Sequence, residues 1–143
     1  MQTSARNHFS GCMTHIRRGL ANDEVELTLA GGERIVTLID GGRALAMRLE
    51  AGREAIAFVK ASSVILTTDN TSGFMLSARN LLAGAIRDLH TGLVNTEVVI
   101  ALKGEDTLVA IIPNESAGEL ELTVGKAVNA IFKASDVILG VTV

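Results

Sequence analysis

The sequence of 143 residues has no tryptophan, no tyrosine, one proline and one cysteine. Aromatic residues make up 3% of it, so the side chains on which single-stranded nucleic acid stacks are almost absent. The lone cysteine, Cys12, cannot form an intramolecular disulfide, which fits a reducing compartment. No apolar stretch approaches the ~20 residues of a membrane-spanning helix, and the N-terminus carries no hydrophobic signal core. We therefore expect a cytoplasmic protein without a membrane partner.

The chain also lacks an excess of positive charge, since its formal net charge is −3. A nucleic-acid-binding protein usually presents a basic face, so the charge balance argues against a nucleic-acid partner. Hydrophobic residues make up 48% of the sequence and charged residues 20%, which is typical of a globular chain with an aliphatic core.

What the sequence does contain is an internal repeat. Shifting it by 73 residues aligns residues 4–66 with 77–139 without a gap, and 24 of the 63 aligned positions are identical. We therefore expect two tandem modules, at residues 1–66 and 76–143, joined by a polar linker at residues 67–75.

Each module is predicted to consist of short strands and one short helix. In the second, residues 81–90, 96–104 and 107–113 have strand composition. Residues 114–122 follow as a helix with Asn114 at its N-cap, and residues 41–49 are its counterpart. Five strands with a helix before the fourth predict a mainly β fold of two tandem OB-like, five-stranded Greek-key barrels; a small β-sandwich is the alternative. Because such a module buries a thin core, the two should pack on each other or on other subunits.

The repeated polar positions are the candidates for function, because most other positions have changed. They hold Ser, Arg, Asn, Glu and Lys but no His or Cys, which is a poor set for a metal cation or for catalysis. An Arg fork, a Lys charge and Ser hydroxyls form instead a good set for a tetrahedral dianion. The pairs are Ser4/Ser77, Arg6/Arg79, Asn7/Asn80, Asn22/Asn95, Glu24/Glu97, Lys60/Lys133 and Ser62/Ser135.

Structural roles are the alternative explanation for the same residues. Asn7 at the start of a strand could satisfy backbone groups, and Lys60 could pair with Glu24 on a barrel rim. Asn22 and Asn95 lie in "GLAN" and "GLVN", where asparagine commonly forms a turn.

Three motifs in order, "SARN", "GLVNTEV" and "KASDVIL", make the chain resemble the molbindin family, built from Mop or TOBE modules. The resemblance extends over nearly the whole chain, because each of the two repeats resembles one module of the family. It implies that molybdate or tungstate binds at module interfaces, with Ser and Arg from "SARN" and Lys from a neighbouring module, in a homotrimer. The molybdate-binding residues so nominated are Ser4, Arg6, Lys60, Ser62, Ser77, Arg79, Lys133 and Ser135.

The resemblance also identifies a loop after the third strand, where many family members place a Thr and a Ser near the ligand. The second module keeps Ser116 of this pair, whereas the first has Asp40 and Arg43. We therefore expect the second "SARN" to belong to the more complete site. A second oxyanion site of the family lies around the turn that holds Asn22 and Asn95.

The resemblance implies a cytoplasmic protein that binds molybdate or tungstate for storage and homeostasis, with no organic cofactor and no catalysis. The alternative is a molybdate-sensing regulatory module that acts on a protein partner, as in the effector domain of a molybdate-responsive transcription regulator. An OB-fold nucleic-acid binder is a third candidate, which the composition disfavours.

Overall fold

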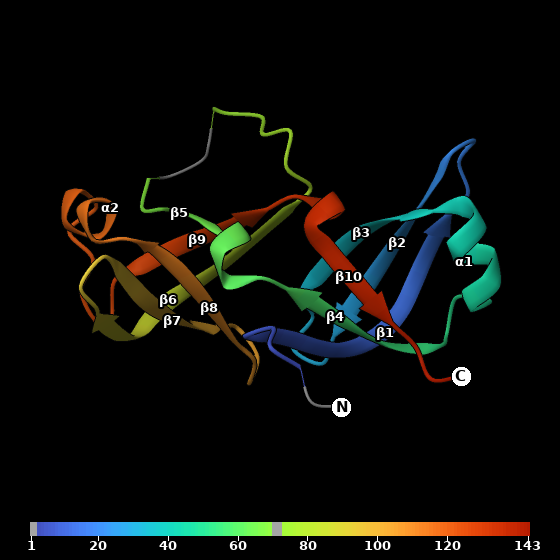
Figure 1. Ribbon diagram of the computed structural model, residues 1–143, viewed down its shortest axis with the longest axis horizontal. Helices are drawn as coiled ribbons and strands as arrows, with labels where there is room; N and C mark the ends of the chain where they lie inside the picture. The colour runs from blue at the N-terminus through green and yellow to red at the C-terminus, as the bar shows by residue number, and fades with distance from the viewer. Residues whose placement is uncertain (1–2, 70–72) are drawn as a thin grey trace.

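The computed structural model describes residues 3–69 and 73–143, and its fold is mainly β. Two five-stranded, curled sheets lie side by side, each with one short helix at its outer end (Figure 1). This confirms the predicted fold class. Residues 70–72 of the predicted linker lie outside the described residues.

The two halves have the same order of elements. The first consists of β1 (Asn7–Arg17), β2 (Asn22–Leu29), β3 (Arg34–Asp40), α1 (Gly41–Met47), β4 (Glu54–Val59), the 3-10 turn η1 (Ala61–Ser63) and β5 (Ile65–Thr67). The second consists of β6 (Asn80–Thr91), β7 (Asn95–Leu102), β8 (Thr107–Pro113), α2 (Asn114–Glu119), β9 (Ala127–Phe132), η2 (Ala134–Asp136) and β10 (Val137–Gly140).

The last strand of each repeat pairs with the other repeat. The sheet orders are β10-β4-β1-β2-β3 and β5-β9-β6-β7-β8, so β10 completes the first sheet and β5 the second. Figure 1 shows the exchange as a red strand beside the blue and green ones, and a green strand beside the orange ones. Each sheet therefore contains strands of both repeats, which the repeat pattern alone did not predict.

Alternating side chains explain why these segments form half-buried strands. Along β2, every second residue from Asp23 to Leu29 is buried, and the residues between them are partly exposed. The buried faces of both halves meet in one hydrophobic cluster that includes Phe9, Met13, Ile100 and Phe132. The core is therefore shared by the two repeats, as expected for modules too small to bury much surface alone.

Two repeated asparagines join the halves from inside this core. Asn7 is 1% exposed; its amide donates to the Val109 carbonyl at 2.8 Å and accepts from the Val109 N–H at 2.7 Å. Asn80 makes the same pair of bonds with Val36, at 2.8 and 2.7 Å. The "N" of each "SARN" is thus a structural residue, in line with the role in satisfying backbone groups considered for Asn7.

A pair of repeated glycines lies where the two halves touch. A Cβ atom added to Gly31 would lie 2.6 Å from the Gly104 Cα, and one added to Gly104 would lie 2.8 Å from the Gly31 Cα. Because contacts that short do not occur, only glycine permits this approach of the β2–β3 and β7–β8 turns. Glu33 fastens the contact by accepting a hydrogen bond from the Gly104 N–H at 3.1 Å.

The predicted N-cap at Asn114 is wrong. The N-cap of α2 is Pro113, and no side chain caps it. The Asn114 side chain accepts a hydrogen bond from the Thr96 hydroxyl at 2.7 Å and donates to the Gly92 carbonyl at 2.9 Å. These bonds use the amide to hold the β6–β7 turn, so it is not available to the helix. In the described part of the chain, no helix is long and apolar enough to cross a membrane.

Candidate functional site

The structure brings the first "SARN" and the first "KAS" to one pocket. Ser4, Arg6, Lys60 and Ser62 line a cavity of about 660 Å³. The cause is the antiparallel pairing of β1 with β4, in which Asn7 lies opposite Val59. The residues before β1 and after β4 therefore meet at one end of the sheet, and both charged predicted ligands share one wall.

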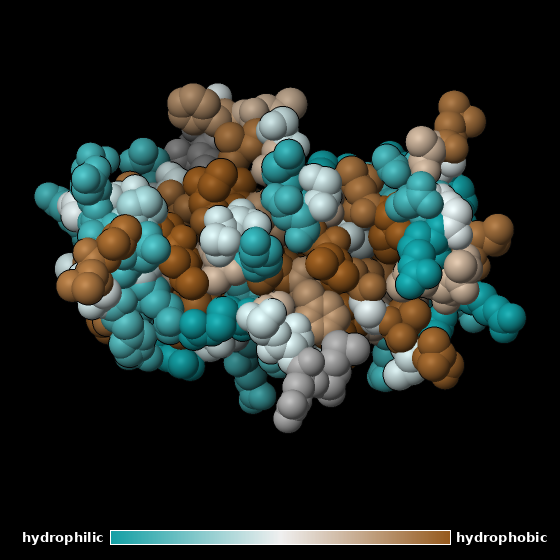
Figure 2. All heavy atoms as spheres, viewed as in Figure 1, coloured by the Kyte–Doolittle hydropathy of each residue, from teal (hydrophilic) through white to brown (hydrophobic). Residues whose placement is uncertain are grey.

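Within one chain, the pocket holds the lysine and the arginine of the same repeat, and the expected lysine from a neighbouring module stays a prediction. Lys60 lies beside Arg6 of its own repeat, because their strands are direct neighbours. The other repeat contributes apolar wall instead, from Ile111 on β8 and from Ile138 to Gly140 on β10. Figure 2 shows hydrophobic surface over β8 and over β10. The pocket thus depends on the strand exchange as well as on the repeated motif.

Ser116 does not accompany the second "SARN" within the chain. It lines an adjoining pocket of about 360 Å³ together with Ser62 of the first repeat. The two pockets share Ser62 and Ile111, so the wall from Arg6 to Ser116 is continuous. The reason is that η1 packs on β8, which leads into the loop that carries Ser116.

The second set of predicted residues has the same strand pairing, but Arg79 lines a pocket of about 400 Å³ with Glu26 and Arg34 whose lining does not include Lys133. Asn80 lies opposite Phe132 in the β6–β9 pairing, which places the segment of Ser77 and Arg79 beside Lys133 and Ser135. The adjoining loop is that of the first repeat, because η2 packs on β3 and the Val137 carbonyl accepts from the Thr37 hydroxyl at 2.9 Å.

That loop has changed its chemistry. Asp40 caps α1, where its carboxylate accepts a hydrogen bond from the Arg43 N–H at 3.1 Å. The charge of Asp40 is therefore directed to the helix N-terminus, which it stabilises. Arg43 lines a separate cavity of about 730 Å³ with Arg48 and Arg53.

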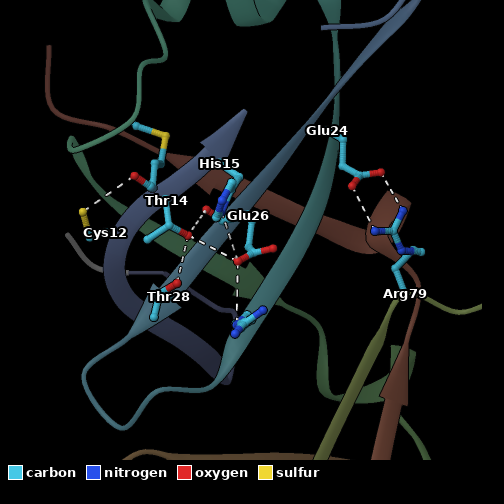
Figure 3. Close-up of polar contacts among 9 residues, drawn as sticks. Cys12, Thr14, His15, Glu24, Glu26, Thr28 and Arg79 are labelled. Carbon is cyan, nitrogen blue, oxygen red and sulfur yellow. Dashed lines mark hydrogen bonds and ion pairs between the residues drawn. The ribbon is translucent and has the colours of Figure 1, made fainter. Parts of the chain in front are cut away.

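Both "SARN" arginines form ion pairs with the repeated glutamates of the opposite half. Arg6 Nη1 lies 2.9 Å from Glu97 Oε2, and the two Nη atoms of Arg79 lie 2.6 and 2.9 Å from the Glu24 carboxylate oxygens (Figure 3). The hydrogen bond from Arg6 lowers the pKa of the Glu97 carboxyl and raises that of the arginine itself. Glu24 therefore pairs with Arg79, and the suggested pairing with Lys60 is not found among the described contacts.

Asn22 and Asn95 open β2 and β7 at the turns. Both side chains are exposed, and the Asn95 carbonyl accepts a hydrogen bond from the Gly92 N–H at 2.8 Å. Beside them Leu20 and Leu93 are fully exposed. The Asn95 backbone thus closes its turn, and the second oxyanion site predicted for both asparagines stays a prediction.

The pocket contains apolar residues that were not predicted to be site residues, although Ile138 belongs to the motif "KASDVIL". Phe58, Ile111 and Ile138 form much of its wall. Ile138 is 67% exposed and its counterpart Ile65 is 63% exposed, so one signal was available: an apolar residue repeated on an exposed strand. Within residues 3–69 and 73–143, no three His, Cys, Asp or Glu side chains gather where they could hold a metal ion.

Comparisons with known proteins agree with this architecture. The model of the TOBE domain family matches residues 3–66 and 76–139. A structure of the cytoplasmic molybdate-binding protein ModG with molybdate bound has 42% identity and a TM-score of 0.95, covering 99% of this chain and 100% of that one.

Three curated relatives match nearly the whole chain. Molybdenum transport protein ModE of Herbaspirillum seropedicae is 38% identical over 141 residues, covering 99% of this chain and 52% of the relative. Molybdenum-pterin-binding protein MopA of Rhodobacter capsulatus is 38% identical over 139 residues, and the DNA-binding transcriptional dual regulator ModE of Escherichia coli K12 is 32% identical over 140; each match covers 97% of this chain and 52% of the relative. The chain thus spans about half the length of these relatives.

Proposed function

From the premise that the chain belongs to the TOBE domain family, we propose that it binds molybdate or tungstate in the cytoplasm, for storage and homeostasis and without catalysis. The observation that carries the proposal is the convergence of Ser4, Arg6, Lys60 and Ser62 on one pocket, with Ser116 on the adjoining wall. The set contains two cationic side chains and three hydroxyls. Arginine and lysine supply the charge that a dianion needs, and hydroxyls supply directed donors.

The family relation supports the identity of the anion. ModG, whose structure contains molybdate, matches the whole chain with 42% identity. Two of the relatives, ModE of Herbaspirillum seropedicae and MopA, have molybdenum in their names. The third, ModE of Escherichia coli, is named as a transcriptional regulator. Molybdate and tungstate are tetrahedral dianions of nearly equal size, so the same donors suit both.

A second copy of the chain is needed to close this site. A pocket of about 660 Å³ has the volume that proteins use for drug-sized ligands, which are much larger than a tetrahedral oxyanion. An ion bound there by one chain would keep much of its water. The exposed apolar residues Leu20, Leu93 and Ile138 are suited to contacts between copies. We propose that copies assemble as a homotrimer and complete the site.

Isothermal titration calorimetry tests the proposal directly. We expect purified protein to bind molybdate and tungstate at micromolar or lower concentration, and to bind sulfate and phosphate much more weakly. Arg6→Ala should weaken molybdate binding at the first site by about 10-fold to 100-fold, the range of a hydrogen bond to a charged group. Absence of molybdate binding by the wild-type protein would contradict the function.

Arg79→Ala is the matched variant, because it removes the same side chain from the second site. It should lower the number of molybdate ions bound per chain and leave the first site's affinity unchanged. Native mass spectrometry of the same samples measures the number of chains and of bound ions together. A monomer that binds molybdate fully would contradict the proposed trimer.

A regulatory role is the second candidate. It is favoured by the match to about half of DNA-binding transcriptional dual regulator ModE, since the same repeat occurs in a longer regulator. Oxyanion binding would then signal to a protein partner. A partner recovered from cell extract with molybdate, but not with sulfate, would support this role over storage.

A further inference from the structure

The repeated glutamates at positions 24 and 97 have a role that the binding function does not yet explain. We propose that Glu97 and Glu24 are built-in competitors: each occupies the arginine of a "SARN" until an incoming oxyanion displaces it. The proposal rests on the proposed function, because it concerns the affinity of the same sites. In this proposal each glutamate sets the affinity of one site for the oxyanion.

The geometry brings Glu97 next to the first pocket, which it does not line itself, through two residues that do. Its carboxylate accepts a hydrogen bond from Arg6 Nη1 at 2.9 Å. Glu97 lies on β7 directly opposite Ile111 of β8, and Ile111 lines the pocket together with Arg6. A dianion that bonds to Arg6 would therefore lie beside a carboxylate that bonds to the same guanidinium.

The N–H of Arg6 Nη1 that bonds Glu97 is not available to a second anion, so an incoming oxyanion must displace the carboxylate or use the remaining N–H groups beside it. The parallel N–H groups of a guanidinium match one carboxylate or one oxyanion face in a bidentate pair. The like charges of a carboxylate and a dianion also repel each other at this range. Binding must therefore weaken the Arg6–Glu97 bond or proceed with a less favourable contact, and either outcome lowers the affinity.

The two arginines are engaged to different extents. Arg79 uses both Nη atoms on Glu24, at 2.6 and 2.9 Å (Figure 3), whereas the described contacts of Arg6 with Glu97 are made by Nη1 alone. The Arg79 side chain should therefore be harder to recruit. We expect the first site to fill before the second in the wild-type protein.

Each ion pair also crosses from one half to the other. Arg6 precedes β1 and Glu97 lies on β7, and Arg79 precedes β6 while Glu24 lies on β2. An oxyanion that takes the arginine thus removes a contact between the halves. An exposed pair contributes little to stability, so the ion can displace the glutamate without unfolding the interface.

The test replaces each glutamate with its uncharged isostere. Glu97→Gln should tighten molybdate binding at the first site by about twofold to tenfold, the range expected from removing an exposed competing charge. Glu24→Gln should act on the second site and produce the larger gain, because it releases a bidentate pair. Calorimetry of the full-length protein with molybdate measures both.

Two controls separate competition from other effects. Glu105→Gln removes the same charge from an exposed turn that lines neither pocket, and it should leave affinity unchanged. Sulfate should gain the same factor as molybdate in Glu97→Gln, since any anion that uses Arg6 must displace the same carboxylate. A glutamate that merely oriented the arginine would instead give weaker binding when replaced, and altered selectivity.

The possible results are distinguishable. Tighter binding of both anions in Glu97→Gln, with thermal unfolding unchanged, supports the proposal. Unchanged or weaker binding in a folded variant overturns it while leaving the proposed function intact. If Glu97→Gln does not fold, Glu97→Ala, which removes the same carboxylate, must show the same gain. Lack of molybdate binding by the wild-type protein would remove the function and this inference together.

Discussion

The two halves of the molecule have the same arrangement of strands but differ in the loop that lies beside each "SARN". Beside the first "SARN" lies the loop of the second repeat, with Pro113 and Ser116. Beside the second "SARN" lies the loop of the first repeat, with Asp40 and Arg43. The loop beside the first "SARN" thus offers a hydroxyl, whereas in the other loop Asp40 caps a helix and Arg43 lines a separate cavity.

The comparison shows how strand exchange separates a motif from its partner loop. Because β5 and β10 cross between the sheets, η1 packs on β8 and η2 packs on β3. A change in one repeat's loop therefore affects the site that contains the other repeat's motif. Within one chain, Ser116 therefore lies near "TSARNHF", while the expectation that "LSARNLL" belongs to the more complete site stays a prediction.

The largest effect should come from the feature that the halves share. Asn80→Ala should destabilise the protein by about 2–4 kcal/mol, because it leaves the buried N–H and carbonyl of Val36 without partners. Asn7→Ala should give a similar loss through Val109. Urea unfolding at one fixed protein concentration measures both.

The exposed Asn22→Ala is the control for this comparison, with an expected change within about 0.5 kcal/mol. If Asn7→Ala and Asn80→Ala differed by more than about 2 kcal/mol, the two halves would not be joined equivalently, and the symmetry of the framework would be broken.

The next largest effect is expected on molybdate affinity, from substitutions in the two loops beside the "SARN" motifs. Ser116→Ala should weaken molybdate binding at the first site by about fivefold, the loss of one hydrogen bond worth about 1 kcal/mol. Arg43→Ala changes the equivalent position in the loop of the first repeat, and it should leave the molybdate affinity of the first site unchanged. Calorimetry with molybdate measures the affinity of both variants. A reversed result would show that loops serve the motif of their own repeat, through contacts between copies.

The smallest effect is a difference in pH dependence between the two strand turns. In the first, Asp23 accepts hydrogen bonds from Arg18 Nη1 at 2.7 Å and from the Gly19 N–H at 3.2 Å. The bond from Arg18 is the main cause that lowers the pKa of Asp23 below its ordinary value. The second turn uses the neutral pair Thr96 and Asn114 instead.

Because the folded-state pKa of Asp23 is lowered, its stabilising contribution is fully present above the unfolded value of about 4 and is lost as pH falls through the folded value. Unfolding measured from pH 6 to pH 2 should show a smaller loss of stability in Asp23→Asn than in the wild-type protein. Thr96→Val should keep the wild-type pH slope. Identical slopes for wild type and Asp23→Asn would contradict the comparison.

Local chemistry made much of the fold predictable. The β8 segment 107–113 was predicted with the bounds that the structure has, because its apolar, β-rich composition ends at Pro113 before a helix. The helix that follows was predicted in place, but its cap was not. Asn114 has the side chain of a good N-cap, yet Thr96 and Gly92 lie close enough to bind it, and these are neighbours only after folding.

The candidate site was predictable in composition but not in arrangement. Identity at positions 73 residues apart selected Ser4, Arg6, Lys60 and Ser62, which the structure gathers in one pocket. The same identity could not assign Glu97 to Arg6, since a repeat shows which residues are kept and gives no contact between them.

By itself the sequence determined the duplication, the strand and helix order, and the polar residues available to each half, because these follow from composition and periodicity along the chain. Only the tertiary structure decided which strand closes which sheet, and hence which loop faces which motif. That choice depends on burying β5 and β10 against β9 and β4, far away in the chain. Burial of apolar surface is not directional, so the repeat pattern permits either strand to close either sheet, and only packing of the whole core selects one.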